Sequence, residues 1–199
     1  MSLFKKLFGS ETEPKEEETK SEYFTPENSN LPTDELFTLN YKKNGGKFIY
    51  CENLDEVREQ FENILEENDW FEKDVLCFED KIKVLLDENK LPHIGIGDPV
   101  FFFGSCENLI AEEGAVLFSS NQIKHYKPSE LPTNIVILAT TSQILNNKND
   151  GMRMIKQKYI SHYPSNITSI KYFEKSQNDD FLTHGSSPKN IYLLLLEDM

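Results

Sequence analysis

The chain has 199 residues, of which 38% are hydrophobic and 28% are charged, and its formal net charge at pH 7 is −13. This length suits one globular domain with an additional tail, and no apolar run approaches the ~20 residues of a membrane-spanning helix. The acidic balance repels phosphate backbones and the sequence has no basic stripe, so we expect neither a nucleic-acid partner nor an integral membrane segment.

The three cysteines, Cys51, Cys77 and Cys106, are far apart in the sequence and form no Cys-x-x-Cys pair. An odd and sparse set of this kind is typical of buried thiols in a reducing compartment. The four histidines also lack the spacing of metal ligands. We therefore expect no metal site and no cofactor. Since no secretory signal is visible, we expect a cytoplasmic protein.

The negative charge is unevenly distributed along the chain. Residues 1–34 carry a net charge of −4 and residues 52–90 carry −9, whereas the remainder is balanced. Residues 1–33 are dominated by Glu, Lys, Thr, Ser, Pro and Asn, a composition typical of disorder. The sequence predicts a disordered acidic tail over residues 1–33 and an α/β domain over residues 34–199.

The first half of the domain alternates predicted strands and helices. A helix is predicted after Asn53, with Glu56 as its capping-box partner, and a second helix is predicted after a cap at Asp80. Residues 37–41 are predicted to form a strand or a lead-in to one, and short apolar runs predict strands at residues 47–51, 75–78 and 100–103. This order is typical of a mainly parallel sheet that is sandwiched by helices.

The stretch 106–140 is predicted to form the centre of the sheet. It contains an apolar strand at residues 115–120 and a second at residues 135–139, which shows no polar alternation and is therefore expected to be covered on both faces. We predict that these two strands lie side by side. A helix over residues 142–160, interrupted near 146–151, and strands at 167–173 and 191–196 complete the domain.

Polar residues just beyond these strands predict the location of a binding site. Ligands of α/β proteins usually bind at the carboxyl ends of the strands, where Ser119, Ser120 and Thr140 are placed. These hydroxyls suit a phosphate or a carboxylate, and they equally suit helix caps. The Gly/Ser loop at His184 and Gly185 precedes the last strand and is predicted to share the mouth of the same site.

Glu112 is the candidate catalytic residue, because it lies at a bend directly before the first central strand. A carboxylate there can act as acid, base or nucleophile if burial raises its pKa. Glu112 and Glu113 point in opposite directions on extended backbone, so one of them faces a pocket at most. Gly114 follows them. The alternative interpretation of Glu112 and Glu113 is a solvated turn.

Four segments, in this order, resemble the LUD domain of lactate-utilisation proteins of the LutC/YkgG type: residues 110–114, 129–137, 164–168 and 184–196. The resemblance implies a fold like that of the NagB/RpiA/CoA-transferase group. It also implies a cytoplasmic bacterial protein that takes part in the oxidation of L-lactate to pyruvate beside separate iron–sulfur subunits. By analogy with the related CoA-transferases, Glu112 takes the place of a nucleophile two residues before a glycine.

The chain departs from the LUD pattern at the positions where a ligand is expected. Glu113 and Ala115 flank Gly114 where the family has hydroxyl residues, and residues 171–180 replace a small Ser-Gly-Pro loop. Loss of glycines where backbone approaches a ligand should alter or remove binding.

The sequence therefore predicts a divergent accessory or ligand-binding subunit. The alternatives are an enzyme that handles acyl-CoA or a sugar phosphate, with Glu112 buried and facing a pocket, and a non-enzymatic interaction module, with a filled crevice at the end of the sheet.

Overall fold

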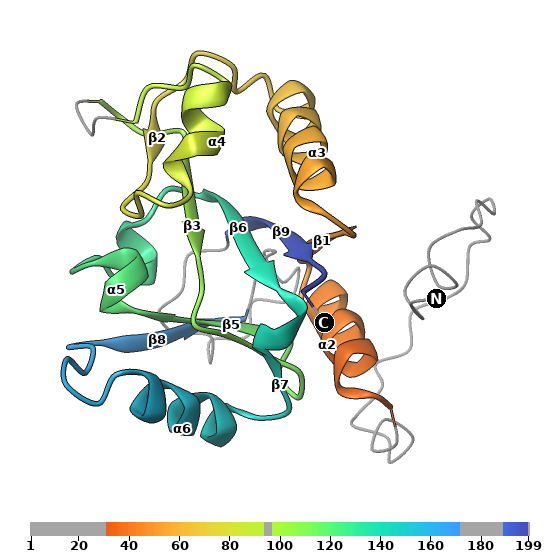
Figure 1. Cartoon of the computed structure of the whole chain (residues 1–199). Helices are drawn as coiled ribbons and strands as arrows, with labels where there is room; N and C mark the ends of the chain where they lie inside the picture. The colour runs from red at the N-terminus through yellow and green to blue at the C-terminus, as the bar shows by residue number, and fades with distance from the viewer. Residues whose placement is uncertain (1–30, 94–96, 172–188, 199) are drawn as a thin grey trace, which may run out of the picture. The chain divides into compact units, whose positions relative to one another are not determined.

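The computed structural model describes residues 31–93, 97–171 and 189–198 (Figure 1). The chain divides into two compact units, Met1–Leu31 and Pro32–Met199. The second unit contains every helix and strand discussed below. None of the helices in the described ranges has the length and apolar character needed to span a membrane.

The second unit begins with a helix, α2 (Thr33–Lys43), which buries Phe37, Thr38 and Tyr41. The prediction of a strand at residues 37–41 was wrong, because the buried residues recur at the i, i+4 spacing of a helix. A turn at residues 44–45 follows, and then the strand β1 (Lys47–Cys51), which was predicted.

Helix α3 (Leu54–Glu67) begins at the predicted cap. The side chain of Asn53 accepts hydrogen bonds from the backbone N–H groups of Asp55 and Glu56, which satisfies donors that a helix leaves unpaired at its start. The short strand β2 (Val75–Leu76) and helix α4 (Lys83–Glu88) come next. Asp80 does not cap α4, since the residue before the helix is Ile82 and the Asp80 carboxylate pairs with Lys83.

Five parallel strands form the first sheet in the order β1-β9-β6-β3-β2. β3 is Phe101–Ser105, β6 is Asn134–Thr140 and β9 is Asn190–Leu196. The central position predicted for residues 135–139 is confirmed, because β6 is the middle strand. The predicted α/β class with a mainly parallel sheet is confirmed as well.

The second sheet has the order β7-β4-β5-β8 and is mostly antiparallel. Its strands are β4 (Asn108–Ile110), β5 (Ala115–Ser119), β7 (Ile144–Leu145) and β8 (Ile167–Ile170). The prediction that the strand at residues 115–120 lies beside the strand at 135–139 was therefore wrong. A tight turn at Gly114 folds β5 back on β4, and this hairpin carries it into the second sheet.

Short helical segments connect these strands. They are α5 (Ser120–Ile123) and the 3₁₀ helices η2 (Pro128–Glu130) and η3 (Thr141–Gln143), followed by α6 (Lys148–Lys158). The interrupted helix predicted over residues 142–160 consists of η3 and α6 with β7 between them. The break lies at residues 144–147, slightly earlier than the predicted 146–151, of which residues 148–151 belong to α6.

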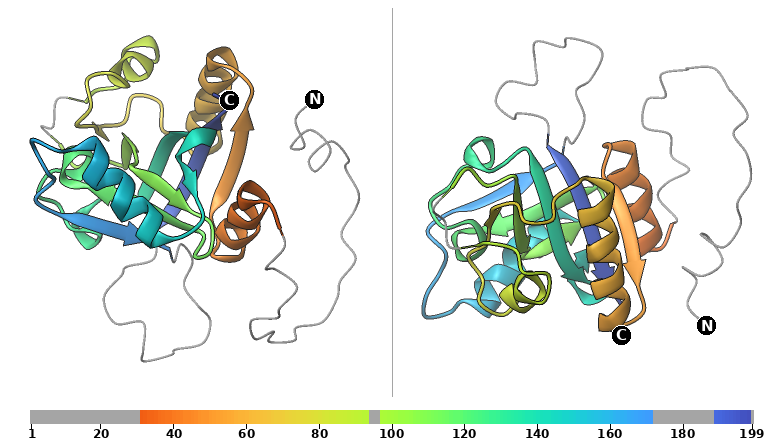
Figure 2. Two further views of the ribbon diagram at one scale, coloured as in Figure 1. Left: turned by 60° about the horizontal axis from the view of Figure 1, so that its bottom comes forward. Right: turned by 90° about the horizontal axis from the view of Figure 1, so that it is seen from above.

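The two sheets pack face to face, and helices cover their outer faces (Figures 1 and 2). Phe102 and Ile137 of the first sheet share a buried cluster with Val116 and Phe118 of the second. The other face of the first sheet packs against α3 and α4, which lie in front of it in the right-hand view of Figure 2. α6 covers the second sheet through Ile155. Apolar residues on both faces of β3 and β6 are explained by this layering.

Candidate functional site

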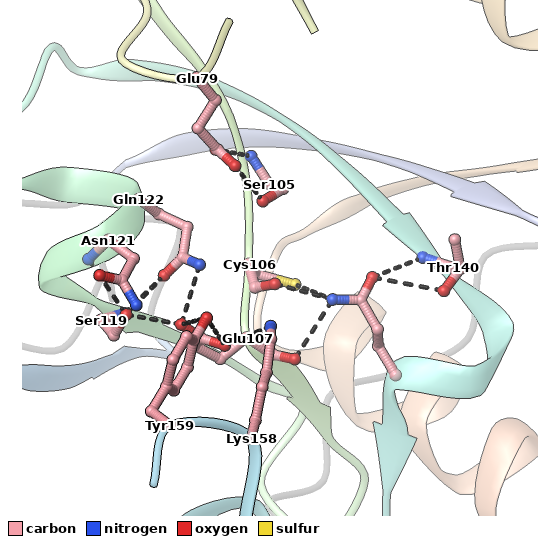
Figure 3. Close-up of polar contacts among 11 residues, drawn as sticks. Glu79, Ser105, Cys106, Glu107, Ser119, Asn121, Gln122, Thr140, Lys158 and Tyr159 are labelled. Carbon is pink, nitrogen blue, oxygen red and sulfur yellow. Dashed lines mark hydrogen bonds and ion pairs between the residues drawn. The ribbon is translucent and has the colours of Figure 1, made fainter. Parts of the chain in front are cut away.

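A buried carboxylate, Glu107, lies between the end of β3 and the start of β4, at the carboxyl edge of the first sheet (Figure 3). Its Oε1 accepts hydrogen bonds from Ser119 Oγ at 2.6 Å, Gln122 Nε2 at 2.9 Å and Tyr159 OH at 3.0 Å. Its Oε2 lies 2.9 Å from Lys158 Nζ. Glu107 thereby ties α5 and the end of α6 to the second sheet.

The contacts of Glu107 keep it ionised. Burial alone raises the pKa of this carboxyl, but the hydrogen bonds from Ser119, Gln122 and Lys158, together with the Lys158 charge, outweigh burial and lower it. The pKa of Lys158 is raised, because its bonds to Tyr159 and Glu107 outweigh burial, which lowers it. An ionised carboxylate that is enclosed by four donors suits a structural role, since it reaches no solvent-borne substrate.

Thr140 lies on the other side of the backbone segment that contains Cys106 and Glu107. Its N–H donates to Gln143 Oε1 at 2.8 Å, and Gln143 Nε2 donates to the carbonyl oxygens of Cys106 at 2.7 Å and Glu107 at 3.2 Å. The structure therefore brings the predicted residues Ser119 and Thr140 to opposite sides of Cys106 and Glu107, even though β5 and β6 are in different sheets. Burial raises the pKa of the Cys106 thiol, which disfavours the reactive thiolate.

The exposed carboxylate of Asp198 binds the first residues of η3. Its Oδ1 accepts hydrogen bonds from Thr141 Oγ1 and Ser142 N, both at 2.9 Å, and its Oδ2 accepts from Ser142 Oγ at 2.6 Å. Burial raises the pKa of Asp198, but these bonds and one from Thr140 outweigh it and lower the pKa to about 2. So weak a base does not take a proton from a serine hydroxyl, so Ser142 is not activated as a nucleophile by this pair.

Ser119 and Ser120 act in the fold at the end of β5. Ser119 caps α5 with its hydroxyl, and Ser120 Oγ accepts a hydrogen bond from Ser165 N at 3.1 Å. Thr140 is likewise the residue before η3. The helix-cap interpretation thus holds for the Ser119 hydroxyl, and the role of the three residues toward a ligand stays a prediction.

The turn that contains Glu112 and Gly114 packs against α2. Asn40 Nδ2 donates to Ala111 O at 2.8 Å, and Asn44 Nδ2 donates to Glu113 O at 2.8 Å. Gly114 has a φ of +56°, and a Cβ there would lie 2.3 Å from the backbone carbon of Asn40. Gly114 is thus required for the close approach of the helix.

Glu112 itself is exposed, and Asn146 Nδ2 lies 3.4 Å from its Oε1. The catalytic hypothesis required a buried Glu112 that faces a pocket, and Glu112 is exposed, so its catalytic role stays a prediction. The residues His184 and Gly185 lie outside the described part of the chain. Lys189, the nearest described residue after them, directly precedes β9 at the amino edge of the first sheet, opposite to Thr140.

Sequence reasoning missed Glu107, Lys158 and Asp198. Glu107 could have been identified from the sequence, because it is the one charged residue between the apolar runs of β3 and β4. A lone carboxylate in such a stretch indicates a buried polar partner. Asp198 gave no signal, since its partners Thr141 and Ser142 are more than 50 residues away.

A pocket of about 530 Å³ lies at the amino edge of the first sheet, at the starts of the neighbouring strands β2, β3 and β6. Its lining comes from residues 74–76, 97–100 and 130–134, with Tyr126. Hydrogen bonds join these segments: Val100 N donates to Asp74 O at 2.9 Å, and Asn134 Nδ2 donates to Val100 O at 3.1 Å. None of the predicted site residues that the structure describes, Glu112, Gly114, Ser119, Ser120 and Thr140, lines it.

No family model and no curated protein matches the sequence. Among solved structures, the chain is similar to a DUF162 family protein from Deinococcus radiodurans, with a TM-score of 0.57 and 13% sequence identity. The match covers 83% of this chain and 99% of that chain. At this identity the likeness establishes a common α/β fold.

Proposed function

We propose that this chain is a divergent LUD-like protein that serves as an accessory or ligand-binding subunit in the oxidation of L-lactate to pyruvate. The observation that carries the proposal is the agreement in fold with a DUF162 protein, a LUD-domain-like neighbour, over most of both chains. The four LUD-like segments, which follow one another in the order of that family, support the same assignment.

The carboxyl edge of the first sheet supports an accessory role. Three described carboxylates at this edge are engaged within the chain: Glu107 by Lys158 and three neutral donors, Asp198 by η3, and Glu79 by the N–H and hydroxyl of Ser105, both at 2.7 Å. Carboxylates that are bound in this way stabilise the carboxyl edge of the first sheet. The proposed chemistry of lactate oxidation therefore belongs to partner subunits.

The proposed partners are separate iron–sulfur subunits of a cytoplasmic complex. Cluster ligation requires thiolates that converge on one point. In this chain, Cys51 and Cys77 are buried in the core between the first sheet and α3, and Cys106 is buried between the two sheets. This distribution supports a complex in which the partners contribute the clusters.

Affinity purification of the tagged chain from cells grown on L-lactate tests the proposal. We expect iron–sulfur proteins to co-purify in near-stoichiometric amounts and to be much reduced in cells grown on glucose. Deletion of the gene should abolish growth on L-lactate alone, and the wild-type gene should restore it. Normal growth of the deletion strain on L-lactate, with no iron–sulfur protein recovered, would contradict the proposal.

Complementation with Glu112→Gln separates this role from that of a CoA-dependent enzyme. We expect Glu112→Gln and the matched neighbour Glu113→Gln to restore growth equally, because Glu112 is exposed and its backbone, not its carboxylate, holds the turn. Mass spectrometry after incubation with acyl-CoA mixtures should reveal no glutamyl thioester. Loss of growth with Glu112→Gln alone, or an adduct on Glu112, would favour the enzyme.

A further inference from the structure

The pocket at the amino edge of the first sheet combines a ligand-sized volume with described lining residues of one charge sign. Within the part of the chain that the structure describes, the three charged lining residues are Asp74, Asp98 and Glu130, and no lysine, arginine or histidine lines the pocket. A concave site of a few hundred Å³ with a few convergent polar groups is the usual form of a small-molecule site.

Two of the carboxylates are held in place by the fold. Glu130 Oε2 accepts a hydrogen bond from Lys127 N at 2.7 Å, which fixes the side chain at the start of η2. Asp74 is half-buried, and its carboxylate fills the space beside Gly97, where a Cβ would lie 2.3 Å from Asp74 Oδ2. Asp98 is exposed at the rim.

One aromatic side chain contributes to the wall. The Tyr126 ring packs against Phe78, with ring centroids 5.4 Å apart, and against His125, with ring centroids 4.6 Å apart. The face of an aromatic ring attracts a cation. Tyr126 therefore complements the carboxylates, because both favour positive charge in the pocket.

The charge balance around the pocket stays negative when the nearest buried cation is included. Lys189 is 3% exposed, and its ammonium donates a hydrogen bond to the carbonyl oxygen of Leu131, a lining residue, at 2.6 Å. Lys189 itself is not among the lining residues. Its single positive charge offsets the charge of one of the three carboxylates.

We propose that this pocket binds a small organic cation with two or more amino or guanidino groups. Ammonium and guanidinium groups donate charge-assisted hydrogen bonds to carboxylates, and a short apolar linker packs against Tyr126 and Pro99. Lactate and pyruvate are anions and are repelled by the same lining. The inference is independent of the lactate proposal, since it concerns a different ligand class at the opposite edge of the sheet.

Isothermal titration of the full chain with agmatine and with spermidine tests this inference. We expect saturable binding at low ionic strength that weakens at least tenfold in 0.5 M NaCl, because screening reduces the attraction between opposite charges. L-lactate should not bind to this pocket. The double variant Asp98→Asn/Glu130→Gln should lose affinity at least tenfold, while its melting temperature confirms that it is folded.

The matched control is Glu59→Gln/Glu62→Gln, which removes the same net charge from the exposed face of α3. Its affinity for agmatine should equal that of the wild type. Tyr126→Leu, which keeps the carboxylates, should weaken binding severalfold. Absence of binding, equal losses in the pocket and control variants, or tighter and Asp98-dependent binding of Mg²⁺ would each overturn the inference. Failure of L-lactate growth tests would leave the titrations unaffected, so the two proposals fail separately.

Discussion

At the scale of single residues, Glu107 makes the largest set of polar contacts at the carboxyl edge. We expect Glu107→Gln to lower the free energy of unfolding by about 1–3 kcal/mol, because the amide cannot accept from Ser119, Gln122, Tyr159 and Lys158 together. Urea denaturation at pH 7 measures the change. The exposed Glu112→Gln is the control and should stay within about 0.5 kcal/mol of the wild type.

The same carboxylate predicts a pH dependence. The pKa of Glu107 is lowered in the folded state from its ordinary value of 4.5, so its contribution to stability is present above that value and is lost as pH falls through the folded pKa. The difference in stability between wild type and Glu107→Gln should therefore shrink as pH is lowered from 7 into the acid range. A difference that grows toward low pH would show that Glu107 is protonated in the folded protein.

For Lys189 we predict the opposite of the effect at Glu107: removal of the charged group should stabilise the fold. Burial lowers its pKa, and the described partner of its ammonium is one carbonyl oxygen. Lys189→Met should thus stabilise the fold by about 1 kcal/mol or more, since it removes a buried charge for which the described residues provide no ionic partner. The gain, measured by denaturation, should diminish as pH rises through the lowered pKa of the folded state toward 10.5, the ordinary value that applies to the unfolded chain. A destabilised variant at pH 7 would contradict this.

At the scale of elements, α2 is attached to the hairpin turn of the second sheet through Asn40 and Asn44. Asn40→Ala/Asn44→Ala should lower the free energy of unfolding by about 1–3 kcal/mol, because two part-buried pairs of hydrogen bonds are lost. Lys43→Ala, exposed on the same helix, is the control. Equal effects of the two variants, measured by thermal or urea unfolding, would show that the contacts contribute nothing.

The elements also mark how far sequence patterns reach. Continuous apolar runs predicted β3, β6 and β9 correctly, since burial on both faces removes alternation. The same pattern in β5 was misleading. This strand belongs to the second sheet, which lies between the first sheet and α6, so it is also covered on both faces. Periodicity reports burial and does not reveal which sheet a strand joins. The short helix α2 was misread, since Phe37, Leu39 and Tyr41 alternate with polar residues, and five residues are too few to distinguish a helix from a strand.

At the scale of the whole molecule, residues 32–199 form a unit with its own cores. A chain that begins at Pro32 should fold, with a free energy of unfolding within about 0.5 kcal/mol of the full chain, because the buried clusters lie within this unit. Urea denaturation of both chains measures the difference. A truncated chain that does not fold would mean that residues 1–31 contribute to the core.

The location of the candidate site was only partly accessible from the sequence. The rule for α/β sheets led to the carboxyl edge, and Ser119 and Thr140 do lie there on either side of Glu107. The pocket is at the amino edge, and its lining comes from three segments that are separated by more than 20 residues each. No local pattern brings such segments together, because their proximity follows from the strand order.

Mapping of ligand contacts by NMR tests the central claim that the carboxyl edge is committed to internal bonds and the amino edge is open. Backbone amide shifts of the full chain are followed during titration with agmatine and, separately, with L-lactate. We predict that agmatine shifts amides of residues 74–76, 97–100 and 126–134, while those of Glu107 and Thr140–Ser142 stay constant. Agmatine-dependent shifts at Glu107 and Thr140 with none around the pocket would contradict the account.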